Sequence, residues 1–406
     1  MNQKSSLFAL LFTIFNDAIG WGIVLTIFAP LLFDPANGIL PADTSDAARN
    51  LILGILISSY AITQFLSMPI IGALADHFGR KKLLEWTIFG NIASFFFSAV
   101  AIWMANLPLL FAARLLSGLF SANSAIAQAS IADVSSEREK SKNLALGGMV
   151  GGIAWIVGPP LGGILSTPRW IPWFDFATPF LALASLFVLN YFWVHTGFQE
   201  TYQPQEKTDW KHEIKNLRKV ASMPWMKGWL SVAFLYDLGW FFFLLYYPQL
   251  FVQKFHFDQE GIGFFSAYLS LFWLLGSFVL NRWLGDLHPA KILFSVMPVL
   301  GILISLGNWE DTISGWSWTF PLLGLGGTLA WTSIMAQISN LSGKENQGKA
   351  FGVLQSISSL ALLIAPFVSG IIAAENIELP MYLGSIILII AGFYALVLHS
   401  KRSESV

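Results

Sequence analysis

Cysteine is missing from all 406 residues of the chain. This absence excludes disulfide bonds, thiolate nucleophiles and cysteine-ligated metals. The sequence also contains no phosphate-binding loop, no metal-ligand cluster and no nucleophile with a matching base. The six histidines all fall in predicted loops or at the ends of apolar runs: His77, His195, His212, His256, His288 and His399. We therefore expect no enzymatic activity, no cofactor and no metal site.

Charged residues are scarce as well. They make up 12% of the chain, whereas hydrophobic residues make up 55%. Soluble domains carry about 25% charged residues, so this chain has too few to cover a water-exposed surface. The net charge of −1 gives no basis for nucleic-acid binding. The composition therefore predicts a membrane protein in contact with lipid.

Long runs without charge recur along the whole sequence. Each is long enough to cross ~30 Å of hydrocarbon as a helix that rises ~1.5 Å per residue. The first run is too long for a signal peptide and contains Asp17. We predict an all-α membrane protein with twelve spans: 7–33, 51–75, 83–105, 108–132, 143–166, 174–195, 226–252, 262–284, 289–308, 315–339, 350–373 and 380–399.

Lysine and arginine are distributed unevenly between the predicted loops. With the N-terminus in the cytoplasm, 19 of the 23 lie in or beside cytoplasmic loops. Only Arg49, Arg169 and Lys254 lie on the opposite side, and Arg114 lies within a span. This bias predicts that both termini are cytoplasmic. Together with the compact loops, it favours a bacterial inner membrane protein, which we expect to be a monomer.

The sequence divides into two similar halves. "FTIFNDAIGWGIVLTIFAPLLF" corresponds to "AFLYDLGWFFFLLYYPQLF", and Asp76 corresponds to Asp286. Pro159 corresponds to Pro366, 207 residues further on. We predict an N-terminal six-helix bundle (1–198), a cytoplasmic linker (199–225) and a C-terminal six-helix bundle (226–406). The linker is either an amphipathic interfacial helix or an ordinary flexible connection.

Three stretches resemble motifs of the major facilitator superfamily. "GALADHFGRKK", residues 72–82, is similar to the loop signature between its second and third spans through Gly72, Asp76, Gly79 and Arg80. "FAARLLSGLFSAN" resembles its Arg-centred motif through Arg114 and Gly118. "GPPLGG", residues 158–163, matches the antiporter-type motif in part, since two upstream glycine positions are occupied by Ala145 and Ala154.

The resemblance extends over essentially the whole chain. "NDAIGWGIVL" and "KENQGKAFGVLQSISSLALLIAP" are similar to the drug/proton antiporter branch, which includes tetracycline exporters. The family implies twelve helices in two pseudo-symmetric six-helix bundles. It further implies that Asp76 meets the start of the eleventh span, and that Arg80 pairs with Asp133 to hold the cytoplasmic side closed. The alternative is that this loop only orients the chain in the membrane.

Three ionisable residues lie inside predicted spans, where charge is costly and by default suggests function. Asp17 and Asp237 each lie roughly 15 Å deep, about ten residues into a helix. We expect Asp17 to be the proton-coupled carboxylate, with Arg114 as its charged neighbour. A purely structural Asp17–Arg114 ion pair, or a bond from Asp17 to the backbone near Gly20 and Gly22, is the alternative. Asp237 is a candidate for substrate binding, coupling or helix packing.

The expected substrate site is a central cavity that is mostly aromatic, with a few placed polar groups. The candidate residues are Trp21, Tyr60, Gln64, Asn123, Gln128 and Trp155 in the first half, and Trp240, Tyr246, Tyr268, Trp331, Gln337 and Gln355 in the second. Pro159 and Pro366, with Gly158 and Gly162 beside the first, are expected to kink the fifth and eleventh spans.

These features favour a secondary active transporter that exports an amphipathic small molecule in exchange for protons. One alternative is a facilitator or proton symporter that imports a metabolite. The other is a receptor without transport activity on a transporter fold.

Overall fold

The computed structural model describes residues 3–136, 138–200, 222–223, 225–284, 287–343 and 346–404. All regular structure within these residues is helical, as predicted. The first half contains α1 (Gln3–Phe33), the 3-10 helix η1 (Pro35–Asn37), α2 (Asp46–Phe78), α3 (Arg80–Trp103), α4 (Leu107–Leu119), α5 (Asn123–Val134), α6 (Lys140–Leu165) and α7 (Thr178–Gly197). Most of the predicted linker (199–225) lies outside the described residues.

The second half contains a corresponding series of helices. These are α9 (Met226–Phe255), α10 (Gln259–Phe278), α11 (Leu280–Leu284), α12 (Pro289–Trp309), α13 (Ile313–Ser342), α14 (Gln347–Ala373) and α15 (Leu379–Glu404). Within the described residues, eleven segments are long and apolar enough to cross a membrane. α13 has 30 residues and lies where the tenth span was predicted, but it is not among these eleven segments. It contains many glycine, serine and threonine residues.

The fourth predicted span, 108–132, is interrupted. α4 ends at Leu119 and α5 begins at Asn123, so the expectation of one continuous helix is wrong there. Nδ2 of Asn91 on α3 donates to the carbonyl of Phe120 at 2.9 Å, which satisfies a backbone group that the break leaves unpaired. Gly90 makes room for the break, because a β carbon there would lie 2.2 Å from the Phe120 ring.

The chain forms two compact units. The first consists of Met1–Arg49, Leu56–Thr208 and Phe257–Ala267, and the second of Asn50–Ile55, Asp209–His256 and Tyr268–Val406. Each unit therefore combines most of one predicted half with a short segment of the other. The start of α10 belongs to the first unit, and Asn50–Ile55 of α2 belong to the second.

Small residues allow these short segments to pack closely. In the first unit, a β carbon at Gly163 of α6 would lie 2.5 Å from the carbonyl oxygen of Gln259, just before Glu260. In the second unit, Gly54 of α2 lies against Pro366 and Gly370 of α14 in the same way. Close approach of backbones through glycine is typical of packing between membrane helices.

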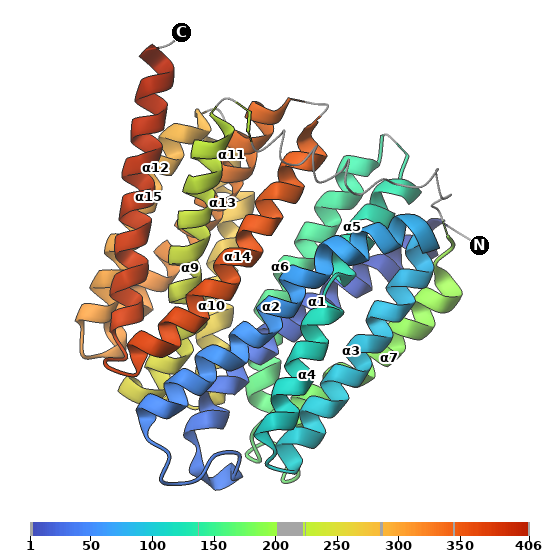
Figure 1. Cartoon of the computed structure of the whole chain (residues 1–406), viewed down its shortest axis with the longest axis vertical. Coiled ribbons are helices and arrows are strands. Elements are labelled where there is room, and N and C mark those ends of the chain that lie inside the picture. The colour runs from blue at the N-terminus through green and yellow to red at the C-terminus, as the bar shows by residue number, and fades with distance from the viewer. Residues whose placement is uncertain are drawn as a thin grey trace. The chain divides into compact units, whose positions relative to one another are not determined.

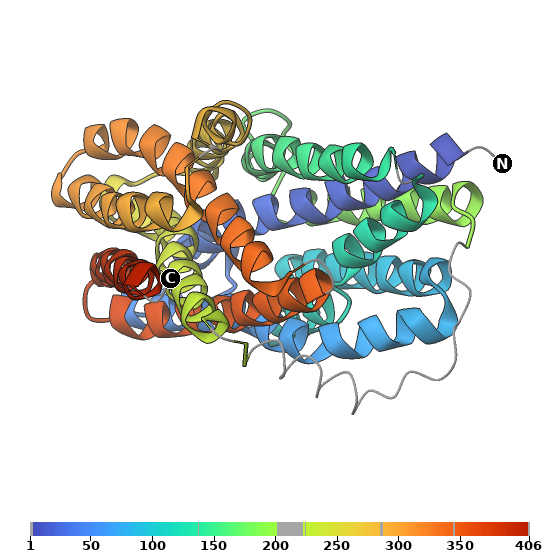
Figure 2. The same cartoon turned by 90° about the horizontal axis from the view of Figure 1, so that it is seen from above.

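In the first unit, α1 and α6 lie side by side (Figures 1 and 2). A β carbon at Gly158 would lie 3.1 Å from the backbone of Ile19, and one at Gly162 would lie 3.1 Å from that of Ile23. The ring of Pro159 packs against Gly22 of α1, where a β carbon would be 2.6 Å away. The "GPPLGG" motif is therefore a packing surface for the helix that carries Asp17.

Helices of the second unit pair in the same way as those of the first. The contacts of α1 with α6, α3 with α7 and α3 with α4 correspond to those of α9 with α14, α12 with α15 and α12 with α13. These pairs join spans one and five, three and six, and three and four of each half. The agreement fits the internal repeat found in the sequence.

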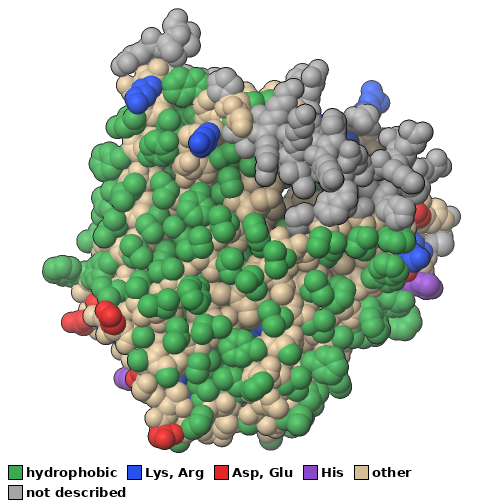
Figure 3. Space-filling view, viewed as in Figure 1, with side chains coloured by type: hydrophobic (Ala, Val, Ile, Leu, Met, Phe, Trp, Pro, Cys, Tyr) green, Lys and Arg blue, Asp and Glu red, His purple; other side chains and the backbone are tan. Residues whose placement is uncertain are grey.

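Hydrophobic side chains cover most of the face seen in Figure 3, and charged side chains lie near its edges. Large apolar residues are exposed along the helices, among them Phe89 at 64% and Phe192 at 60%. Trp103 and Trp309 stand exposed at the ends of α3 and α12. A soluble protein would not expose so much apolar surface, whereas tryptophan at helix ends is typical of membrane interfaces.

Candidate functional site

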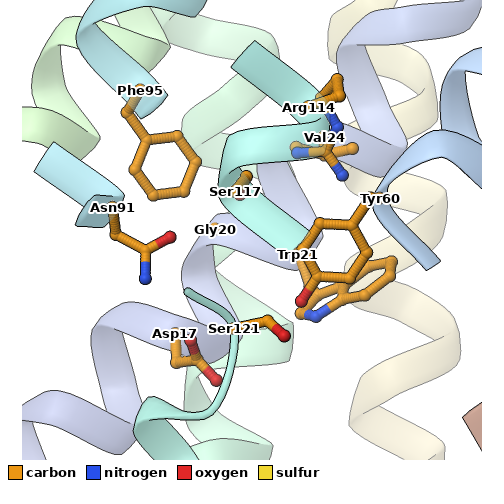
Figure 4. Close-up of a pocket in the computed structure, with 10 residues that line it drawn as sticks. All are labelled: Asp17, Gly20, Trp21, Val24, Tyr60, Asn91, Phe95, Arg114, Ser117 and Ser121. Carbon is orange, nitrogen blue, oxygen red and sulfur yellow. The ribbon is translucent and has the colours of Figure 1, made fainter. Parts of the chain in front are cut away.

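A small cavity lined by both polar and apolar side chains lies among the helices of the first unit (Figure 4). It is lined by Asp17, Gly20, Trp21 and Val24 of α1, Tyr60 of α2, Asn91 and Phe95 of α3, Arg114 and Ser117 of α4, and Ser121 from the break before α5. The volume open to the centre of a water molecule is about 20 Å³. Since roughly 10–15 Å³ is enough for one water, this cavity can be hydrated.

The carboxyl group of Asp17 is held by the first turn of α5. The hydroxyl of Ser124 donates to Oδ2 of Asp17 at 2.7 Å, and Nδ2 of Asn123 lies 3.5 Å from Oδ1. The backbone N–H of Ser124 also donates to this carboxyl group. A helix N-terminus favours negative charge, because its N–H groups lack partners within the helix. The break in the fourth span thus gives an intramembrane acid its partners.

Arg114 is buried in the same cavity but is not paired with Asp17. Its guanidinium carbon lies 4.7 Å from the centre of the Tyr60 ring and 5.3 Å from that of Phe28. Figure 4 shows Arg114 and Asp17 at opposite ends of the labelled residues. Among the described residues, Asp17 and Arg114 therefore form no ion pair, and Asp17 has no hydrogen bond to the backbone near Gly20 and Gly22.

Four other candidates from the first half lie in or beside this cavity. Trp21 and Tyr60 line it, with their rings edge to face at 4.8 Å. Nε2 of Gln64 donates to the Tyr60 hydroxyl at 3.2 Å, and Asn123 faces Asp17. The remaining two, Gln128 and Trp155, are not among the lining residues.

Asp237 of α9 is buried, and the hydroxyl of Ser358 on α14 donates to it. Next to it, the Tyr236 hydroxyl donates to the carbonyl of Gly327 at 2.8 Å, and Trp240 stacks near Tyr236 with ring centres 6.2 Å apart. Asp237 and Asp17 occupy corresponding places in the repeat, yet their partners differ. Asp17 is bonded by the first turn of α5, which follows the break in the fourth span, whereas Ser358, the partner of Asp237, lies in the interior of α14.

The remaining candidates of the second half do not line the cavity of Figure 4. Tyr246 is fully buried, and its hydroxyl donates to the carbonyl of Asn50 at 3.0 Å. Tyr268 donates to the carbonyl of Ser317 at 3.2 Å. Gln337 is buried, Trp331 is half-buried and Gln355 is exposed. Their proposed contact with substrate is not tested by these positions.

The loop motif at residues 72–82 forms one of its two expected contacts in the described residues. Arg80, at the start of α3, forms an ion pair with Asp133, near the end of α5. Gly79 has φ of +90° and caps α3, a conformation that favours glycine. The side chains of Gly72 and Asp76 lie outside the described residues, so the expected contact of Asp76 with the eleventh span is not described.

Sequence reasoning missed a third partner of this motif. Oε1 and Oε2 of Glu200 accept hydrogen bonds from the backbone N–H groups of Arg80 and Lys81 at 3.0 and 2.9 Å. Nζ of Lys81 donates to the carbonyl of His195 at 2.7 Å. Glu200 thus caps α3 from the end of the sixth span, about 120 residues further along the chain.

Pro159 and Pro366 lie inside α6 and α14, which both continue through them. The role of these residues, together with Gly158 and Gly162, in kinking the helices stays a prediction.

A sequence model described as the Major Facilitator Superfamily matches residues 10–323 and 283–405. The chain belongs to the major facilitator superfamily. It is therefore an integral, multi-pass transporter of small molecules and not an enzyme, as the sequence predicted.

Relatives of this superfamily member include two drug-resistance proteins. The class C tetracycline resistance protein of Escherichia coli is 26% identical over 391 residues, which is 93% of this chain and 91% of the relative. The quinolone resistance protein NorA of Staphylococcus aureus (strain MRSA252) is 25% identical over 397 residues, 94% of this chain and 93% of the relative.

Among solved structures, the human organic anion transporter MFSD10 superposes with a TM-score of 0.71 at 18% identity. The match covers 97% of this chain and all of the human chain. It supports the fold that the sequence predicted.

Proposed function

We propose that this transporter exports an amphipathic small molecule in exchange for protons, with Asp17 as the group that carries the proton. The observation that supports this most directly is the placement of Asp17. Its carboxyl group is buried at membrane depth in this cavity and bonded by the first turn of α5. A carboxylate that gains and loses a proton there changes the hydrogen bonds that connect α1 with α5.

Export rather than import is favoured by the two relatives whose names denote drug resistance. We further propose that both termini are cytoplasmic, on the basis of the distribution of lysine and arginine. The membrane would then be a bacterial inner membrane, and Arg80, Asp133 and Glu200 would lie on its cytoplasmic side.

Uptake into liposomes under an imposed pH gradient tests both the coupling and its direction. The purified protein is reconstituted, and a panel of fluorescent amphipathic compounds is offered from outside. For proton antiport, an acidic lumen drives uptake, because protons leave as substrate enters. This result does not depend on the orientation of the protein in the vesicle.

Other outcomes would contradict the proposal. Uptake driven by an acidic exterior would indicate a symporter. Uptake that ignores pH, or that a protonophore leaves unchanged, would indicate a facilitator. A receptor would show binding without movement of solute.

We also propose that the Arg80–Asp133 pair helps to close the cytoplasmic side. Both side chains are partly exposed, at 16% and 29%, so we expect the pair to contribute only about 1 kcal/mol. Asp133→Asn should therefore lower the initial transport rate by roughly fivefold. Exchange of the two charges, Arg80→Asp with Asp133→Arg, should recover part of that loss. If all variants transported at the same initial rate, the Arg80–Asp133 pair would not contribute to closure of the cytoplasmic side.

A further inference from the structure

Arg114 has an unusual environment for a charged side chain. It is 3% exposed and carries five N–H donors that stay protonated at any physiological pH. Within the described residues no oxygen atom accepts a hydrogen bond from it, and its Nε is fully buried without a partner. A buried cation without hydrogen bonds or a counter-charge strongly destabilises a structure. An ionisable residue inside a membrane span is by default a candidate for function, and a ligand that enters the cavity can supply the missing acceptor.

The acidic groups near Arg114 do not satisfy this need. Asp17 is the one carboxylate among the residues that line the cavity, and it bonds to Ser124 and Asn123 instead. The described ion pairs engage Arg80, Arg169, His195 and Lys254, and Arg114 is in none of them. The charge of Arg114 is therefore available to a group that enters the cavity.

Aromatic rings hold the guanidinium in place without using its donors. Tyr60 lies 4.7 Å and Phe28 lies 5.3 Å from the guanidinium carbon, which are distances of cation–π contacts. Cation–π contacts need no hydrogen-bond acceptor, so they leave the N–H donors of the guanidinium without oxygen partners. Figure 4 shows Arg114 near the Tyr60 ring, with Asp17 at the opposite end of the labelled residues.

We infer that Arg114 binds an anionic group of the transported molecule, and that the substrates are organic anions or zwitterions. The planar guanidinium suits a carboxylate or a similar oxyanion, which it can bind through two parallel hydrogen bonds. The cavity has room for little more than one water here, so an apolar or aromatic body attached to that anion would contact Trp21 and Tyr60 once the surrounding helices move apart during transport. This inference rests on the proposed function and specifies its substrate class. Asp17 and Arg114 then have separate tasks, one for the proton and one for the cargo.

Equilibrium binding of matched pairs of compounds tests this assignment. The probes are a quinolone carboxylate, 1-naphthoate and the methyl ester of each, so that only the negative charge differs within a pair. Binding to the purified protein in nanodiscs is followed by quenching of tryptophan fluorescence. We expect at least one carboxylate to bind roughly 10–100-fold tighter than its ester, the range typical of hydrogen bonds to a charged partner.

Variants of Arg114 connect this preference to the residue. Arg114→Gln should remove the preference for the carboxylate, and Arg114→Lys should retain part of it, because lysine keeps the charge but not the paired donors. Arg169→Gln is the matched control, since that side chain is 75% exposed and lies outside the cavity. The comparison within wild-type protein needs no variant and therefore holds even if Arg114→Gln fails to fold.

Two results would overturn the inference. One is equal binding of every carboxylate and its ester to the wild-type protein. The other is loss of the carboxylate preference when chloride is added to a chloride-free buffer that contains no carboxylate, with chloride stabilising wild type but not Arg114→Gln. That outcome would assign Arg114 to a small inorganic anion. Binding is measured without a pH gradient. A negative binding result therefore does not contradict proton-driven transport, and a negative transport result does not affect the binding test.

Discussion

Replacing Asp17 by asparagine should abolish proton-driven transport. Asparagine has the same shape and can still accept the hydrogen bond from Ser124, but it cannot take up or release a proton. We expect the initial rate of uptake into liposomes with an acidic lumen to fall by roughly 100-fold, equivalent to ~2.7 kcal/mol of barrier. Counterflow of substrate at equal pH on both sides should persist, because exchange does not require net proton movement.

Two further variants make this experiment specific. Asp43→Asn introduces the same chemical change at an exposed position and should transport like the wild type. Asp237→Asn, measured in parallel, decides whether the buried acid of the second unit takes part in coupling or only bonds to Ser358. If Asp17→Asn kept the full response to the pH gradient, another group would have to carry the proton.

The broad architecture could be read from the sequence because it depends on local properties. Hydropathy over about 20 residues is enough to locate a membrane helix, and the repeat was visible from Asp17, Pro159 and their counterparts Asp237 and Pro366. Thus the all-helical fold and the superfamily were predicted correctly. Most helix bounds were predicted to within a few residues. α13 was also placed correctly, although it is not among the eleven segments that are long and apolar enough to cross a membrane.

The details of the site depended on contacts that no local pattern contains. The break in the fourth span needs Asn91 and Gly90 of α3, about 30 residues away from Phe120. Its own sequence signal is weak: "FSANS" contains serine and asparagine, residues that favour the start of a helix. Because α5 starts there, Ser124 bonds to Asp17. Arg114, the expected partner of Asp17, contacts aromatic rings instead.

Other partners were missed for the same reason. Glu200 caps α3 across about 120 residues, and Ser358 reaches Asp237 across 121 residues. Neither Glu200 nor Ser358 belongs to a recognisable sequence motif. Only the packing of the helices brings each of them to its hydrogen-bond partner. The charged residues inside spans were the correct places to look, but their pairing could not be deduced by elimination.

A second large effect is expected at Gly118, one helical turn after Arg114. A β carbon at this position would lie 2.2 Å from the carbonyl oxygen of Tyr60 and 2.1 Å from Oγ1 of Thr63. Because one of these contacts is with backbone, α2 and α4 would have to move apart to admit any side chain. We expect Gly118→Val to destabilise the protein by about 3 kcal/mol or more, lowering its melting temperature in detergent by roughly 6 °C.

Gly148 of α6 provides the control for this prediction, since nothing lies within 4 Å of a β carbon built there. Gly148→Ala should be neutral or slightly stabilising, because alanine is the better helix former. If Gly118→Val had the same melting temperature as the wild type, this result would contradict the close contact between α2 and α4 at Gly118. The position of Tyr60 over Arg114 depends on that crossing, so the carboxylate preference assigned to Arg114 should weaken together with the stability of Gly118 variants.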